Sequence, residues 1–212
     1  MKQDSSLNVC IIVAHPDDET LWAGGLILMH PQWRCFILSL CRASDSDRAP
    51  KFKQALSNLG ALGTMADMDD GPEQHPLSQV ELQQTIMTGI DPPLCDLILT
   101  HGAKGEYTRH RRHEEVSQAV LELVQCGKIR CQELWQFAYE DGSGQYVPKA
   151  DAQASYSVSL PDDIWKRKYK IITEIYGFAP ESWESRVTPR TEAFRRIDIS
   201  QSDSSILSVK ER

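Results

Sequence analysis

The sequence NVCIIVAHPDDETLWAGG, residues 8–25, contains an apolar run, a polar loop and the beginning of an amphipathic segment. From Val9 to Ala14 the residues are apolar without alternation, which is typical of a parallel strand buried on both faces of a sheet. The run ends at His15, and three consecutive acidic residues follow at 17–19. Neighbouring carboxylates repel one another unless a positive charge lies among them. The loop therefore predicts a bound cation at the end of a buried strand.

The rest of the chain alternates between short apolar runs and longer amphipathic segments. Buried strands are predicted at 8–14, 34–41 and 95–101, and helices at about 20–30, 50–60, 78–90 and 112–125. Such alternation predicts an α/β fold with a Rossmann-like, mostly parallel sheet and helices on both faces. The pattern loosens after about residue 130, where it favours strands at 133–140 and 152–160 and a helix at 162–177.

The length and composition indicate one soluble globular domain. A chain of 212 residues suits a single domain over 1–212, with a core over about 7–180 and a frayed tail over about 200–212. The formal net charge of −7 argues against nucleic acid or an anionic membrane as the main partner. No apolar run approaches the ~20 residues of a membrane span, and no secretory signal is evident. We therefore expect a cytoplasmic protein, and the sequence leaves homo-oligomerisation open.

The six cysteines include no CxxC pair, and several lie in or beside apolar strands. Buried free thiols behave as small apolar side chains. We therefore expect neither a structural disulfide nor a thiolate metal site.

The partners of the acidic loop come from a second polar cluster. Ligands bind at the carboxyl ends of the strands in an open parallel sheet, and His110 and His113 follow such a strand at the start of a predicted helix. His15, one of the two aspartates at 17–18 and one of these two histidines would hold a metal while leaving one position open. The remaining acid and histidine could then act as general base and carbonyl-polarising group.

These residues make the chain similar to a known family. AHPDDE after a buried first strand, followed about a hundred residues later by HxxH at the start of a helix, resembles the PIG-L/LmbE-like zinc-dependent N-deacetylases. The resemblance implies a metal-dependent hydrolase that removes an N-acetyl or related N-acyl group from an amino-sugar-type compound or glycoconjugate, such as a derivative of N-acetylglucosamine.

The resemblance also implies a role for individual residues. One Zn²⁺ per chain would be held by three ligands, and its water would be the nucleophile. The metal ligands implied are His15, Asp18 and His113, the catalytic residues Asp17 as general base and His110 as oxyanion stabiliser, and the substrate contacts Arg48 and Asp70. Two nitrogens and one oxygen also suit iron or cobalt, so another divalent ion is an alternative to zinc.

The chain departs from the family pattern within its second motif. Family members often place an aspartate before the second histidine, where this chain has Arg112. A cation there should lower the pKa of His110, unless a nearby glutamate compensates. Arg109, Arg111 and Arg112 could bind a phosphate group or pair with Glu106, Glu114 and Glu115.

Three alternatives remain beside the deacetylase. One is a catalytically silent metal- or carbohydrate-binding protein of the same fold, and another is a deacylase of an antibiotic-like metabolite. A dinucleotide-dependent oxidoreductase shares the fold class, but no GxGxxG motif follows the first strand.

Overall fold

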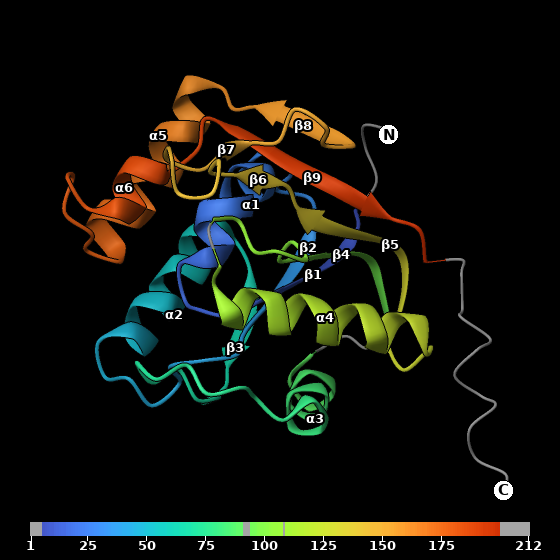
Figure 1. Cartoon of the computed structure of the whole chain (residues 1–212). Coiled ribbons are helices and arrows are strands. Elements are labelled where there is room, and N and C mark those ends of the chain that lie inside the picture. Colours follow the sequence, from blue (N-terminus) through green and yellow to red (C-terminus); the bar gives the residue numbers. More distant parts are fainter. Residues whose placement is uncertain (1–5, 91–93, 108, 200–212) are drawn as a thin grey trace, which may run out of the picture.

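A seven-stranded sheet forms the centre of the computed structural model, which describes residues 6–90, 94–107 and 109–199 (Figure 1). Its strand order is β3-β2-β1-β4-β5-β9-β8. The strands in that order are β3 (Leu62–Met65), β2 (Arg34–Ser39), β1 (Asn8–Val13), β4 (Leu94–Thr100), β5 (Arg130–Phe137), β9 (Thr191–Ile197) and β8 (Tyr156–Ser159). The first five strands run parallel, β9 pairs antiparallel with β5, and β8 pairs antiparallel with β9. A separate pair joins β6 (Tyr139–Glu140) to β7 (Lys149–Ala150).

Helices cover both faces of the sheet. The helices are α1 (Asp18–Met29), α2 (Arg48–Leu59), α3 (Gln79–Gly89), α4 (Arg111–Gln125), α5 (Asp162–Lys170) and α6 (Trp183–Val187), with a π-helical turn, η1 (Ile171–Ile175), after α5. Figure 1 shows α3 and α4 on one side of the sheet and α1, α2 and α5 on the other. Val9, Ile11 and Val13 of β1 pack on the α1 side, and Cys10 and Ile12 pack on the α4 side. Because both faces of β1 are buried, its sequence is apolar without alternation.

The predicted α/β fold class is confirmed, and each predicted helix and strand has a counterpart in the structure. Four elements were not predicted, namely β3, β7, α6 and β9. The four residues of β3 include a glycine, and β9 carries two arginines and a glutamate. Neither stretch is a continuous apolar run, so the sequence pattern does not mark either one as a strand. The tail at 200–212 lies outside the described residues.

The expectation of free thiols is wrong for two cysteines. Cys10 in β1 and Cys95 in β4 form a disulfide, and their Cα atoms lie 6.1 Å apart. Both side chains are buried on the α4 side of adjacent parallel strands, at a separation that permits a disulfide. The two cysteines are 85 residues apart in the sequence, so only the strand pairing reveals their proximity. Cys35, Cys41, Cys126 and Cys131 are free within the described part of the chain.

The parallel strands direct their carboxyl ends toward the polar loops. The loop after β1 starts α1, and the loop after β4 starts α4, so two distant motifs meet beside the same pair of strands. None of the helices in the described ranges is sufficiently long and apolar to cross a membrane.

Candidate metal centre

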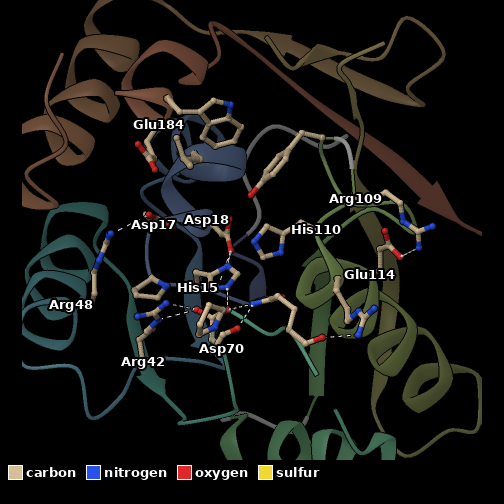
Figure 2. Close-up of a pocket in the computed structure, with 18 residues that line it drawn as sticks. His15, Asp17, Asp18, Arg42, Arg48, Asp70, Arg109, His110, Glu114 and Glu184 are labelled. Atoms are coloured by element: carbon tan, nitrogen blue, oxygen red, sulfur yellow. Dashed lines mark hydrogen bonds and ion pairs between the residues drawn. The ribbon is translucent and has the colours of Figure 1, made fainter. Parts of the chain in front are cut away.

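The predicted ligands meet at the edge of a cavity of about 960 Å³. His15 and Asp18 come from the loop between β1 and α1, and His113 comes from the first turn of α4. Figure 2 shows His15, Asp18, Asp70 and His110 grouped together, with Arg48 and Glu184 farther along the same cavity. The structure therefore brings together residues that lie about a hundred positions apart in the sequence.

Three acceptor atoms form a compact triangle. Oδ2 of Asp18 lies 3.1 Å from Nδ1 of His15 and 3.3 Å from Nε2 of His113, and the two nitrogens are 3.3 Å apart. A tetrahedral zinc ion with ligand bonds of about 2.0–2.1 Å separates its ligand atoms by about 3.3 Å. The three residues therefore fit a divalent cation in both donor type and spacing.

The buried carboxylate of Glu106 fixes the orientation of His113. Its Oε2 lies 2.6 Å from Nδ1 of His113, and both side chains are fully buried. Because an ionised carboxylate only accepts, Nδ1 carries a proton and Nε2 is the nitrogen that faces the triangle. Glu106 also accepts from His101 Nδ1 at 2.9 Å and from the Gly102 backbone N–H at 2.8 Å. These donors lower the pKa of Glu106 to about 2 although burial opposes ionisation.

Asp70 holds the other histidine in the same way. Oδ1 of Asp70 lies 3.2 Å from Nε2 of His15, which leaves Nδ1 of His15 facing the triangle. Arg42 donates to Oδ2 of Asp70 through Nε at 2.9 Å and Nη2 at 2.5 Å, and Gln74 donates to Oδ1. Asp70, for which the resemblance implies a substrate contact, lines the cavity and has its carboxylate bound to His15.

Without a metal ion, the two histidines in the triangle of His15, Asp18 and His113 hold protons tightly. Burial alone would lower the pKa of both histidines, but hydrogen bonds to carboxylates raise the pKa of His15 to about 9 and that of His113 to about 10. Burial likewise opposes ionisation of Asp18, yet His113 and His101 lower its pKa well below the usual range. A metal ion binding here has to displace those protons, so its affinity should rise with pH.

His101 lies beside the triangle but is already engaged. Its Nε2 is 3.5 Å from Oδ2 of Asp18, and the group Asp18, His101 and His113 also has the proximity of a metal site. However, Nε2 of His101 accepts the backbone N–H of Ala14 at 2.9 Å, while Nδ1 faces Glu106. Both ring nitrogens are therefore used within the protein, and His101 supports Glu106 instead of binding metal.

His110 presents an unused nitrogen at the site. Its ring stacks on His113 at 4.1 Å and meets His15 edge-on at 4.8 Å. Within the described residues, the buried Nδ1 of His110 has no hydrogen-bond partner. Burial and the charges of His113 and His15 lower the pKa of His110 to about 3, so the ring is neutral. A neutral imidazole with a free nitrogen can donate a hydrogen bond to a ligand or accept one from it.

The expected lowering of the His110 pKa is present, but Arg112 does not cause it. The guanidinium of Arg112 is fully buried and pairs with Glu115 at 2.6 Å and Asp69 at 3.1 Å. Arg109 pairs with Glu114, and Arg111 donates to the carbonyl of Gln74. The arginines of this helix start therefore engage protein groups.

Asp17 lies next to the triangle in a strained backbone conformation. Its φ angle is 128°, a region that favours glycine. Nη1 of Arg48 lies 3.4 Å from Oδ2 of Asp17, as also seen in Figure 2. Burial and the charge of Asp18 raise the pKa of Asp17 well above its usual range, although His15 and Arg48 oppose this shift. A carboxylate with a raised pKa is a stronger base.

Two features of the site were missed from the sequence. The sequence predicts neither the pairing of Glu106 with His113 nor the place of Trp183 in the cavity. Trp183 lines the cavity, is 38% exposed and meets Tyr107 edge-on at 4.5 Å. A histidine that binds metal needs an acceptor for its second ring nitrogen. This requirement predicts a buried acid beside the site, but it does not say which acid of the sequence fills that place.

Comparisons with known proteins identify the family of the chain and solved structures that share its fold. The PIG-L family, described as GlcNAc-PI de-N-acetylase, matches residues 10–124, which is more than half of the chain. A comparison with curated protein sequences gave no match.

Several solved structures share the fold at low sequence identity. The N,N'-diacetylchitobiose deacetylase from Pyrococcus horikoshii has a TM-score of 0.68 and 15% identity, over 91% of this chain and 84% of that chain. A deacetylase triple mutant of the teicoplanin biosynthetic pathway has a TM-score of 0.65 and 15% identity, over 90% and 99%. GalB, the 4-carboxy-2-hydroxymuconate hydratase from Pseudomonas putida, has a TM-score of 0.61 and 14% identity, over 90% and 96%. At these identities the likeness shows the fold alone.

Proposed function

The chain belongs to the PIG-L family, and from this membership we propose that it is a metal-dependent deacetylase acting on an N-acetylated amino-sugar-type substrate. The observation that carries the proposal is the triangle of His15, Asp18 and His113 at the edge of a large cavity. These three residues would hold one divalent ion, zinc being the best match to two imidazoles and one carboxylate. A divalent ion bound there would polarise the amide carbonyl and lower the pKa of a water molecule.

Asp17 is the general base in this proposal. Its carboxylate lines the cavity next to the proposed ligand Asp18, and its raised pKa makes it a stronger base than an ordinary aspartate. Arg48 keeps the carboxylate paired at 3.4 Å. After accepting a proton from water, Asp17 can pass that proton to the departing amine.

His110 is the proposed stabiliser of the developing negative charge. It lines the cavity, and its neutral ring stacks on His113. A neutral imidazole that donates a hydrogen bond to the amide oxygen supports charge development without adding a fixed positive charge near the metal. Such donors commonly contribute about 3 kcal/mol to transition-state stabilisation.

The cavity has the size and chemistry for a sugar. Its volume of about 960 Å³ accommodates more than a monosaccharide, and its lining combines charged groups with the exposed ring of Trp183. The apolar face of a pyranose stacks on such a ring, while Arg48 and Glu184 offer a donor and an acceptor for hydroxyl groups. An acylated antibiotic-like substrate also fits this volume, so the acyl acceptor is left to experiment.

Metal content and acetate release together test the proposal. We expect about one zinc ion per parent chain after reconstitution and none in His113→Ala, with His30→Ala as a histidine control away from the site. The metal-loaded parent should release acetate from N-acetylglucosamine, N,N'-diacetylchitobiose or another member of an N-acetyl sugar panel. Asp17→Asn should keep the metal and lose at least about a hundredfold in kcat, whereas the exposed control Asp163→Asn should match the parent.

The outcomes separate the alternatives. A chain that stays metal-free after reconstitution would overturn the metal site and the deacetylase together. A metal-loaded chain that releases no acetate from the panel would favour binding without turnover, or a different reaction on the same fold, as the hydratase relative illustrates. An active Asp17→Asn variant would remove Asp17 from the mechanism.

A further inference from the structure

The strained backbone of Asp17 requires a restraint. A residue with a side chain at φ 128° costs about 1–3 kcal/mol and persists only where surrounding contacts impose it. The carbonyl of Asp17 accepts the N–H groups of Thr20 and Leu21 at 3.0 and 2.8 Å, which starts α1. Those two hydrogen bonds restrain the carbonyl group of Asp17, which faces α1. The other restraint acts on its own N–H group.

Glu19 binds that N–H group from within the core. Oε2 of Glu19 accepts the backbone N–H of Asp17 at 3.0 Å, and the glutamate is fully buried. Its other oxygen, Oε1, accepts the hydroxyl groups of Thr20 at 2.6 Å and Tyr176 at 2.7 Å. Two donors at Oε1 therefore orient the Glu19 carboxylate, and its Oε2 in turn holds the N–H of Asp17.

Tyr176 reaches Glu19 from a part of the chain far away in sequence. It is 2% exposed and follows η1, and its backbone N–H donates to the carbonyl of Ile171 five residues earlier at 2.9 Å. The π-helical turn inserts one residue relative to an α-helix, and such turns often occur at functional sites. The residue that follows this turn is the one that contacts the acidic loop.

We propose that Tyr176 and Glu19 are positioning residues that hold the backbone of Asp17 so that its carboxylate keeps a fixed direction in the cavity. The part of this inference that concerns catalysis rests on the proposed function. The part that concerns the backbone does not, because the hydrogen bond between Asp17 and Glu19 is measurable in a chain without activity. Misplacing a catalytic group by about 1 Å can cost about a hundredfold in rate.

The test compares two buried tyrosines that lose the same atom. Tyr176→Phe removes the hydroxyl that anchors Glu19. Tyr139→Phe is the matched control, because its hydroxyl also hydrogen-bonds within the core, to the carbonyl of Trp22 in α1 and to the N–H of Ala193. The first measurement is amide hydrogen exchange of Asp17 by NMR in the full chain. We expect exchange about tenfold faster in Tyr176→Phe and unchanged in Tyr139→Phe.

The second measurement is kinetic, with N,N'-diacetylchitobiose as the probe and zinc-reconstituted protein. Tyr176→Phe should lower kcat about tenfold while KM and bound zinc stay at parent values, and Tyr139→Phe should leave all three unchanged. Glu19→Gln, which replaces one acceptor oxygen by a donor, should accelerate the exchange of the Asp17 amide further than Tyr176→Phe.

The results distinguish this inference from the function on which it builds. If the parent releases no acetate from the probe, the amide exchange of Asp17 still tests whether Tyr176 and Glu19 hold its backbone. Unchanged exchange in Tyr176→Phe, or equal acceleration in both tyrosine variants, would overturn the inference. A loss of kcat shared equally by Tyr139→Phe would show a general effect of core tyrosines and would also overturn it.

Discussion

The two histidines of the proposed metal site have the same kind of partner in very different surroundings. His113 is paired with Glu106 at 2.6 Å, and neither side chain has any exposure to solvent. His15 is paired with Asp70 at 3.2 Å, and their side chains are 16% and 10% exposed. Glu106 lies in the loop between β4 and α4, whereas Asp70 lies in the segment after the edge strand β3.

The difference shows how one site can combine a rigid and an adjustable half. Glu106 is tied to three donors in the core, so its position is set when the sheet and α4 pack together. Asp70 depends on Arg42, whose side chain is 45% exposed, and solvent can replace part of that contact. We therefore expect the buried half to determine both folding and metal affinity, and the exposed half to adjust metal affinity alone.

The largest expected effect is that of Glu106→Gln. The substituted amide keeps the shape of the side chain but turns one acceptor oxygen into a donor, so a buried N–H of His113, His101 or Gly102 loses its acceptor. The free energy of unfolding of the metal-free chain should fall by about 3 kcal/mol, and zinc affinity by about a hundredfold. Urea unfolding and competition with a chromogenic chelator measure the two quantities.

The control for Glu106→Gln is a partly exposed glutamate in α4. Glu122 in α4 accepts hydrogen bonds from Gln83 and Gln118, so Glu122→Gln alters hydrogen bonding away from the site. Its free energy of unfolding should stay within about 0.5 kcal/mol of the parent, with zinc affinity unchanged. An equal loss in both variants would contradict a special role for the buried carboxylate.

Asp70→Asn should have an intermediate effect. The asparagine retains a carbonyl oxygen that can accept from Nε2 of His15, but it has no charge to favour the metal-facing tautomer. Zinc affinity should fall about tenfold, at the lower end for residues that hold a ligand. The free energy of unfolding should change by less than about 1 kcal/mol, because solvent reaches this pair. The same two assays apply, and a larger loss of affinity than in Glu106→Gln would reverse the proposed order of the two halves.

The fold was largely predictable because its core elements are long and regular. Continuous apolar runs marked β1, β2 and β4, since strands covered on both faces cannot carry polar side chains at alternate positions. The unpredicted β9 shows the opposite case. Its Glu192 is buried but bound by Lys168 at 2.7 Å and by the N–H groups of Gly25 and Leu26 at 2.7 Å. A charged residue whose partners are far away in the sequence looks like a surface residue when only the sequence is known, even if it is buried.

The site was predictable in its ligand types but not in its supports. AHPDDE and HxxH indicated a metal because acids and imidazoles converge at the carboxyl ends of adjacent strands. Which acid holds His113 depended on packing, since Glu114 and Glu115 lie nearer to it in the sequence than Glu106 does. The cysteine pair was missed for the same reason, because it depends on a contact between residues 85 positions apart.

The smallest effect is expected at Arg42, and two substitutions there separate its charge from its backbone. Arg42 has φ 72°, a conformation that a side chain disfavours, and it donates twice to Asp70. Both Arg42→Ala and Arg42→Gly remove the ion pair, so zinc affinity should fall no more than about fivefold in each. Only glycine relieves the backbone strain.

Arg42→Gly should therefore be about 1 kcal/mol more stable to urea than Arg42→Ala, even after the greater chain entropy of glycine in the unfolded state. Equal stability of the two variants would mean that the loop relaxes and that no strain is stored at this position. A loss of zinc affinity approaching that of Asp70→Asn would mean that Asp70 cannot hold His15 without its arginine. The exposed half of the site would then be as firmly determined as the buried half, and the contrast between them would disappear.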